Sequence, residues 1–371
     1  MEKIFGAPQR YIQGDGVIDH LGDLIGYLGK RFFVFGDAVV LPLVHDRIEA
    51  GFRQGGKETV FGVFGGESSR PEVVRISEAF RNGSCDVVVG VGGGKAADTA
   101  KAVSLGLRVP IVVLPTIAST DAPTSRIMAI YDDSHRLVEV LRMDRNPDAV
   151  VVDTGLIARA PVRFLVAGMG DALSTKFEAE VCAQTKALNF FKGQGCQSAL
   201  ILARACYDVI RQFGLAAKQA VEAHTVTDAL EKVVEANIFM SGVGFESGGL
   251  AAAHAIHAGF TMIPEMNGSF HGEKVAVALL AQFVMENKER AFIDEMITFY
   301  RQVGLPATLA ELGMAEITDE KMDAIVQRAC LANTYMFNMP MPVDTEFVKE
   351  AIRKADRIAQ SHRGQQGVDI A

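Results

Sequence analysis

Five short apolar runs rich in β-branched and aromatic residues dominate the first 160 residues and constrain the fold more than any other feature. Helical stretches separate them, and each run is apolar on both faces. The runs are RFFVFGD (31–37), TVFGVF (59–64), DVVVGV (86–91), PIVVLPT (110–116) and AVVVDT (149–154). This alternation predicts an α/β domain with a mainly parallel sheet covered by helices. Between the last two runs, residues 128–140 are typical of a hairpin that turns at Asp132, Asp133 and Ser134.

The sequence changes character after Pro161, where long alanine-rich segments follow almost without β-type runs. At 371 residues the chain is also longer than a single core usually supports. We therefore predict two domains, an α/β domain over 1–160 and an all-helical domain over 161–371, with a short linker near residues 157–161.

The charge and cysteine content narrow the class of partner and the compartment. The formal net charge of −8 argues against nucleic acid or an anionic membrane as the main partner. The five cysteines are odd in number and form no C-x-x-C pair. The first twenty residues contain no signal-peptide core, and no apolar run is long enough to span a membrane. We expect a cytoplasmic protein with reduced thiols.

The third apolar run leads into a glycine-rich turn, VGVGGGKAADTAKAV (89–103). It is not a dinucleotide fingerprint, because Lys95 stands where the third glycine is needed, and it lacks the spacing of a P-loop. It can still form an anion cradle, since three glycines and a helix expected from Ala96 onward bring N–H groups and a positive dipole together. A turn that only needs positive φ remains the alternative for the glycines alone. Lys95 and Asp37, which ends the first run, favour an anion site.

A second loop, residues 114–131, also leaves the end of a predicted strand, where open α/β sheets bind their ligands. Its hydroxyls at Thr116, Ser119 and Ser125 can donate to a ligand, and Asp121 is its only carboxylate before Tyr131. Each residue alone could equally cap a surface turn. Several together on one long loop favour a site.

Three residues of the helical half are candidate metal ligands, namely Asp171, His254 and His271. His254 and His257 share a helix face, and Pro264 with Gly268 ends that helix before His271 begins the next one. The alternative is an Asp171 in a first helical turn and two histidines satisfied in a core. The small residues around the histidines leave room for a ligand.

Six blocks of the chain resemble the glycerol dehydrogenases of the iron-containing (group III) alcohol dehydrogenase superfamily. The blocks are VGVGGGKAADTAKAV, LPTIASTDAPTS, NPDAVVVDT, GMGDALSTKFEA, GVGFESGGLAAAHAIH and HGEKVA, in the family's order and spacing. The resemblance implies a Rossmann-like N-terminal domain, an all-α C-terminal domain, the dehydroquinate synthase-like architecture, and an active site in the cleft between the domains. It also implies homo-oligomers, often octamers.

The resemblance implies NAD as cofactor and assigns its contacts in the N-terminal half. These are Asp37, Gly93, Gly94, Lys95, Asp98, Thr116, Ser119, Ser125, Ile127 and Tyr131. A carboxylate at Asp37 would accept hydrogen bonds from an adenosine ribose and repel a 2′-phosphate, which favours NAD over NADP.

The resemblance also implies a divalent metal, normally zinc, held by Asp171, His254 and His271. Thr175 replaces the further histidine of iron-using relatives, which favours zinc. The polyol is expected near both histidine ligands, Asp121 and Phe245, with Asp121 and His254 as the catalytic residues.

The reaction implied is oxidation of glycerol, or a related vicinal diol, to a hydroxyketone such as dihydroxyacetone. Zinc with two imidazole ligands and one carboxylate ligand keeps positions open for a substrate oxygen. It lowers the pKa of a bound hydroxyl, so the resulting metal-bound alkoxide can pass hydride to NAD.

Two departures from the family pattern leave the substrate open. Arg126 stands at a small-residue position and Ile127 where the family has leucine, and PEMNGSF (264–270) replaces a stretch rich in histidine and aromatic residues. An Arg126 that points toward the substrate would favour a carboxylate or phosphate. The alternative is therefore a dehydrogenase or lyase of the same superfamily that acts on an acidic or phosphorylated polyol. A non-catalytic nucleotide sensor is a separate alternative, and the intact set of candidate ligands speaks against it.

Overall fold

The computed structural model describes residues 2–132 and 137–366, and these group into two compact units. The α/β unit comprises Gly6–Phe164 and Gln219–Gly242, and the helical unit contains Leu165–Lys218 and the residues from Val243 onward. Gln219–Gly242 thus belongs to the α/β unit although it follows the first two long helices of the helical unit in the sequence. The division into domains over 1–160 and 161–371 stays a prediction.

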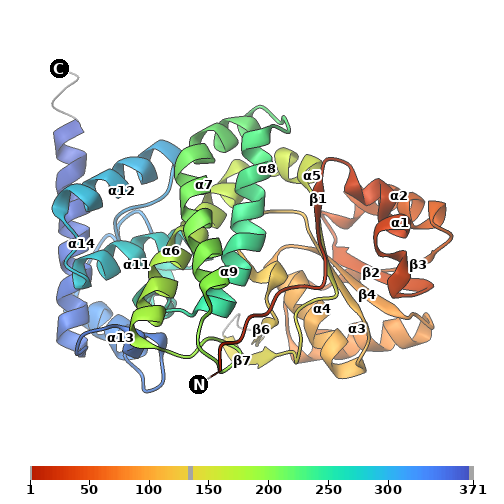
Figure 1. The fold of residues 1–371 in the computed structure, drawn as a ribbon, viewed down its shortest axis with the longest axis horizontal. Helices are drawn as coiled ribbons and strands as arrows, with labels where there is room; N and C mark the ends of the chain where they lie inside the picture. Colours follow the sequence, from red (N-terminus) through yellow and green to blue (C-terminus); the bar gives the residue numbers. More distant parts are fainter. Residues whose placement is uncertain (1, 133–136, 367–371) are drawn as a thin grey trace. The chain divides into compact units, whose positions relative to one another are not determined.

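The α/β unit is built on a six-stranded sheet in the order β1-β8-β5-β4-β2-β3, in which every pair is parallel (Figure 1). The strands are β1 (Tyr11–Gly14), β2 (Arg31–Asp37), β3 (Glu58–Phe64), β4 (Val87–Gly92), β5 (Ile111–Pro115) and β8 (Ala149–Asp153). The five apolar runs are thus five of the six strands, and the mainly parallel sheet is confirmed. The sequence analysis missed β1, because YIQG is a short, half-buried edge strand without an apolar run.

Helices cover both faces of this sheet, as its apolar strands require. Phe32 on β2 packs with Phe52 of α2, while its neighbour Phe33 points to the other face and contacts Phe80 of α3. The helical segments of the unit are η1 (Val17–His20), α1 (Leu21–Ile25), η2 (Gly26–Leu28), α2 (Leu41–Gln54), α3 (Arg70–Asn82), α4 (Gly94–Leu107), η3 (Ala122–Thr124), α5 (Thr154–Arg159), α8 (Asp228–Glu235) and the π-helical turn η4 (Ala236–Met240).

The predicted hairpin is present as a separate antiparallel pair, β6 (Ile127–Tyr131) with β7 (Leu137–Arg142). Two of the predicted turn residues, Asp133 and Ser134, lie outside the described residues.

The strand order places a ligand-binding position at the ends of β2 and β4. From β2 the chain continues to β3 on one side, whereas β4 lies on the other side of β2. Ligands of open α/β sheets bind at such a switch point, outside the carboxyl ends of the strands. Asp37 ends β2 and the glycine turn ends β4, so the sheet brings these two predicted features together.

The helical unit confirms the prediction of an all-α second half, since its described residues form only helices and two isolated bridges. Most side chains of α11 are buried, which its nearly continuous apolar sequence requires. The helices are α6 (Val162–Thr185), α7 (Gln197–Glu222), α9 (Ser241–Gly248), α10 (Ala252–Phe260), η5 (Pro264–Met266), α11 (His271–Met285), α12 (Arg290–Val303), α13 (Asp319–Ala329), η6 (Tyr335–Asn338) and α14 (Thr345–Gln366).

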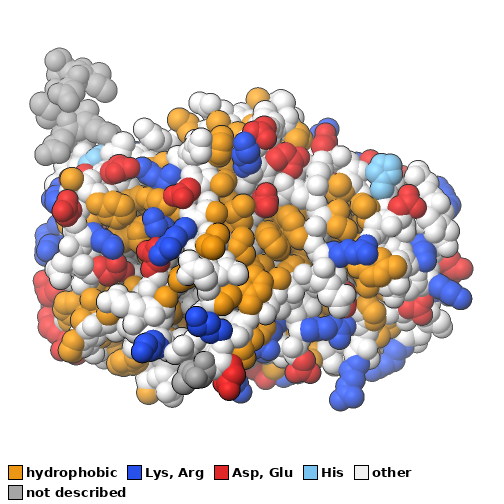
Figure 2. Space-filling view, viewed as in Figure 1, with side chains coloured by type: hydrophobic (Ala, Val, Ile, Leu, Met, Phe, Trp, Pro, Cys, Tyr) orange, Lys and Arg blue, Asp and Glu red, His pale blue; other side chains and the backbone are white. Residues whose placement is uncertain are grey.

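Within the described part of the chain, no helix combines the length and the apolar character needed to cross a bilayer. On the face that Figure 2 shows, acidic and basic side chains are interspersed with apolar ones, and no large area carries a single sign of charge among the residues described.

Candidate metal centre and nucleotide site

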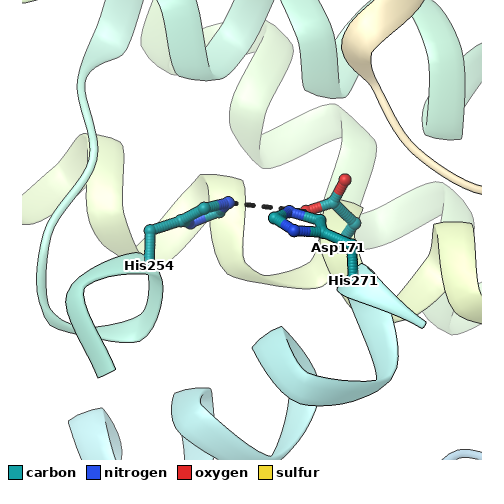
Figure 3. Close-up of side chains that lie close together, drawn as sticks. All are labelled: Asp171, His254 and His271. Atoms are coloured by element: carbon teal, nitrogen blue, oxygen red, sulfur yellow. Dashed lines mark ion pairs between the residues drawn. The ribbon is translucent and has the colours of Figure 1, made fainter. Parts of the chain in front are cut away.

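Three side chains of the helical unit converge on one point, as the sequence analysis predicted. Asp171, His254 and His271 each offer one ligand atom, and these atoms all lie within 4.8 Å of one another. The Asp171 Oδ1 atom is 3.1 Å from His271 Nε2 and 3.5 Å from His254 Nε2. Figure 3 shows both imidazole rings turned toward the carboxylate.

Three different helices hold these side chains. Asp171 lies in the middle of α6, which excludes the alternative of a first-turn aspartate, while His254 is near the start of α10 and His271 begins α11 as expected. A Cβ atom at Gly272 would lie 1.8 Å from the carbonyl oxygen of Ala167, so only glycine allows α11 to approach α6 this closely.

The electrostatics of the cluster favour an ionised carboxylate. Burial by itself raises the pKa of Asp171, but the imidazoles of His271 and His254 outweigh it and hold that pKa well below its usual range. Burial lowers the pKa of His254, yet Glu178 and Asp171 raise it well above its ordinary value. A metal ligand must be deprotonated, so a divalent cation bound here would take the place of the proton that the neighbouring carboxyl groups favour on His254.

Glu178 is a functional residue that the sequence analysis missed. Its Oε2 atom accepts a hydrogen bond from His254 Nδ1 at 2.6 Å, and its Oε1 atom accepts from the backbone N–H groups of Ala251 and His254. The carboxylate thus orients the imidazole and leaves Nε2 toward Asp171. Its sequence signal is weak: Glu178 follows Asp171 by seven residues and so shares its helix face.

His257 lies beside this cluster. Its ring centroid is 4.2 Å from that of His271, and its ring is tilted against His254 at 6.3 Å. Burial, with the neighbouring His271 and His254, lowers the pKa of His257 well below its ordinary value. A neutral imidazole is therefore expected at this position.

The glycine turn has the geometry of an anion cradle. β4 ends at Gly92, whose φ of 142° is a conformation that glycine adopts readily, and α4 begins at Gly94, two residues earlier than predicted. A Cβ atom at Gly94 would find nothing within 4 Å. The first turn of a long helix is thus open on this side, as a bound phosphate would require.

Asp37 faces the same turn from the neighbouring strand. Its Oδ1 atom accepts hydrogen bonds from the N–H groups of Val39 and Val40, and its Oδ2 atom lies 3.5 Å from the position of a Cβ at Gly92. The carboxylate is therefore fixed at the end of β2 beside the glycines.

Lys95 lies at the exposed side of the cradle. Its ammonium group pairs with Glu67 at 2.7 Å and stands 5.5 Å from the ring centroid of Tyr131. Burial, with Asp98 and Glu67, raises the pKa of Tyr131 to about 12. The structure therefore brings two of the predicted NAD contacts, Lys95 and Tyr131, to the same place.

Asp98, another predicted NAD contact, faces the 114–131 loop. Its Oδ2 atom accepts from the N–H of Ala129, and burial raises the pKa of its carboxyl group despite Lys101 nearby. Lys101, which the sequence analysis missed, is fully buried and donates to the carbonyl oxygens of Ala122 and Ile127 at 2.7 and 2.9 Å. These two side chains of α4 hold the loop in place, and their i, i+3 spacing was the available signal.

The remaining predicted residues of the loop are distributed along it. The Thr116 N–H donates to Gly92, which joins the loop to the cradle. Ser125 Oγ accepts from the N–H of Ile127, and Ser119 is partly exposed. The buried Asp121 accepts a hydrogen bond from Ser241 at its Oδ2 atom.

Phe245, a predicted substrate contact, is buried in the helical unit, where its ring meets the edge of Phe190 at 5.4 Å between centroids. Arg126 donates from Nη1 to the carbonyl oxygen of Met143, and the Met143 N–H donates to Arg126 in return. The guanidinium group therefore joins the two ends of the hairpin.

Comparisons with known proteins identify the family of the chain. Residues 8–154 match the model of the iron-containing alcohol dehydrogenase family. The chain is 44% identical over 360 residues to a glycerol dehydrogenase of Citrobacter freundii, covering 97% of this chain and 99% of the relative. It is 45% identical over 357 residues to a glycerol dehydrogenase of Thermotoga maritima, covering 96% and 97%. A solved structure described as a probable glycerol dehydrogenase from Sinorhizobium meliloti superposes with a TM-score of 0.91 at 42% identity, covering 97% of this chain and all of that one.

A parallel α/β unit with a glycine turn at its switch point, joined in one chain to a helical unit with an Asp-His-His cluster that could hold a metal ion, has the parts that a nucleotide- and metal-dependent dehydrogenase needs. The identities over the full length place the chain in a particular group: it belongs to the iron-containing alcohol dehydrogenase family, among relatives named glycerol dehydrogenase.

Proposed function

We propose that this protein oxidises glycerol, or a related vicinal diol, to the corresponding hydroxyketone with NAD as hydride acceptor. The observation that carries the proposal is the convergence of Asp171, His254 and His271, with ligand atoms within 4.8 Å, in a chain of this family. Such a cluster can hold a divalent metal, and the family acts on alcohols.

The three side chains fit a zinc ion better than they fit a cation that prefers oxygen ligands alone. Two imidazole nitrogens and one carboxylate oxygen are a ligand set that zinc accepts, with positions left for substrate. When bound, the metal supplies a Lewis acid that makes an alcohol hydroxyl easier to deprotonate. The chain's own contribution is orientation: Glu178 fixes the His254 ring, and the close contact at Gly272 fixes α11 against α6.

For the cofactor, we propose that the N–H groups of Gly93 and Gly94, with Lys95, bind the diphosphate of NAD, and that Asp37 accepts from the adenosine ribose. The open space at Gly94 and the fixed Asp37 carboxylate support these roles. The other proposed contacts to NAD are Asp98, Thr116, Ser119, Ser125, Ile127 and Tyr131.

For the substrate, we propose that the polyol lies near Asp121, Phe245, His254 and His271. Asp121 would orient a hydroxyl group or accept its proton, and His254 would act as a ligand. In keeping with its family, the protein is proposed to work in the cytoplasm as a homo-oligomer.

The alternative of an acidic or phosphorylated substrate rested on Arg126. Since that guanidinium donates to the carbonyl oxygen of Met143, it has a structural task within the hairpin. A neutral polyol is therefore the better candidate.

The test is a substrate panel on metal-replete protein: glycerol, other vicinal diols, hydroxy acids and phosphorylated polyols, each with NAD and with NADP. We expect reduction of NAD with glycerol or a small diol and much weaker use of NADP. Turnover confined to the acids or the phosphorylated polyols would establish the alternative instead.

A further inference from the structure

The helix formed by α8 and α9 is interrupted by the π-helical turn η4, and this turn faces the loop that carries Asp121. In η4 the N–H of Ser241 donates to the carbonyl oxygen of Ala236, five residues earlier. A π-helical turn changes which side chains share a helix face, and such turns are frequent at functional sites. Asn237 within this turn and Ser241 directly after it are both fully buried.

Three hydrogen bonds join this turn and the residue after it to the loop, all within the α/β unit. Asn237 Nδ2 donates to the carbonyl oxygen of Ala118 at 3.1 Å, and Thr124 Oγ1 donates to that of Ile238 at 3.0 Å. The shortest runs from Ser241 Oγ to Asp121 Oδ2 at 2.6 Å. The turn therefore holds the loop on both sides of Asp121 and also holds the carboxylate itself.

The next residue shows how closely the two segments approach. A Cβ atom at Gly242 would lie 1.9 Å from Thr124 Oγ1 and 2.7 Å from the carbonyl oxygen of Asp121. Only glycine permits this approach, so the spacing that lets Ser241 reach Asp121 is built into the backbone.

We propose that Ser241 is a positioning residue that fixes the Asp121 carboxylate for the polyol. The inference rests on the proposed function, in which Asp121 contacts the substrate. A carboxylate on a loop has several orientations, and a short hydrogen bond from a buried hydroxyl to the ionised group selects one of them. Reaction rates depend on such orientation, because small displacements of a reacting group slow the chemical step.

The test compares Ser241→Ala with Ser104→Ala. Ser104 is a matched control, because it is a buried serine of the same unit whose Oγ donates at 2.6 Å to a backbone carbonyl oxygen, that of Val109. The measurements are kcat and KM for glycerol, the Kd for NAD, and the melting temperature of the metal-replete protein.

We expect Ser241→Ala to lower kcat/KM for glycerol about tenfold, as loss of a hydrogen bond to a charged group does. The Kd for NAD should stay within about twofold of wild type, and Ser104→Ala should leave kcat/KM within about twofold. In an Asp121→Asn background the effect of Ser241→Ala should shrink, because the charge that strengthens the bond is gone. Ser241→Thr, which keeps the hydroxyl, should restore part of the activity.

Each contrary result has a distinct meaning. If the wild type oxidises a polyol, equal losses of kcat/KM in Ser241→Ala and Ser104→Ala would overturn the positioning role of Ser241. An undiminished effect of Ser241→Ala in the Asp121→Asn background would overturn it too. A loss confined to NAD affinity would overturn it as well. Wild-type protein that oxidises no polyol would contradict the proposed function, and the inference would fail with it.

Discussion

The Glu178 carboxylate shows how a residue outside the candidate ligand set can orient one of the ligands. It accepts from the His254 ring and from two backbone N–H groups at the start of α10. We predict that Glu178→Gln lowers zinc affinity roughly 10- to 100-fold, since the amide cannot accept at both positions and the ring loses its fixed orientation. Competition for zinc with a chelator of known affinity measures this.

The control for that variant is Glu180→Gln on the same helix. Glu180 accepts a hydrogen bond from the half-exposed Arg204 at 2.7 Å and lies outside the cluster. Its substitution should leave zinc affinity unchanged, and equal losses in both variants would show that Glu178 has no special role.

Gly94 allows a residue-level test of the cradle that leaves the fold intact. Because a Cβ atom there meets no protein atom within 4 Å, Gly94→Ala should not lower the melting temperature. If the N–H groups of this turn bind the NAD diphosphate, the added methyl group occupies the ligand's space, and NAD affinity should fall about tenfold or more. Titration of NAD by calorimetry is the measurement, with zinc content as a second readout that should not change.

Gly106→Ala, in the same helix and equally unobstructed, is the matched control and should bind NAD as the wild type does. Tight NAD binding by Gly94→Ala would remove the cradle from the proposed site.

At the scale of elements, α4 both begins the cradle and holds the neighbouring loop through Lys101. Its buried ammonium group donates to Ala122 and Ile127 and lies 3.5 Å from Asp98. We predict that Lys101→Met lowers the free energy of unfolding by about 3 kcal/mol, because two buried carbonyl oxygens and a buried carboxyl group lose their partner. NAD affinity should fall too, since the loop carries Ser125 and Ile127.

Urea unfolding with the NAD titration measures both effects. Adding Asp98→Asn to Lys101→Met should recover part of the stability, because it removes the uncompensated carboxylate. Lys57→Met, which removes a single bond to the Gly29 carbonyl oxygen, should cost much less. An unchanged free energy of unfolding in Lys101→Met would show that the loop does not depend on α4.

The same elements show what the sequence could predict. Apolar runs identified five strands, because buried parallel strands must be apolar on both faces. They did not identify β1, because an edge strand need not be apolar on both faces. The start of α4 was placed two residues late, since glycine has little helix propensity although it suits a phosphate-binding first turn.

The candidate ligands Asp171, His254 and His271 were predicted, because their residue types carry the chemistry. Glu178, Lys101 and Ser241 were not, because their roles come from partners between 21 and 120 positions away in the chain. Sequence spacing reports neighbours on one helix, whereas these contacts exist only after the helices and loops have packed.

At the scale of the whole molecule, the candidate metal ligands and the glycine cradle belong to different units of the chain. The two binding functions should therefore separate. His254→Ala is expected to lose the metal and retain NAD binding, whereas Gly94→Ala is expected to lose NAD affinity and keep the metal. If His254→Ala and Gly94→Ala each abolished both metal binding and NAD binding, the two binding functions would not be separate.

The most direct test of the central claim is NAD reduction by metal-replete protein with glycerol, followed at the nicotinamide absorbance, for the wild type and for His254→Ala. The account predicts turnover by the wild type that disappears with a chelator and returns with zinc, and no turnover by a His254→Ala protein that still binds NAD. Glycerol oxidation that survives in His254→Ala would contradict it. So would a zinc-loaded wild type that fails to reduce NAD with every vicinal diol tested.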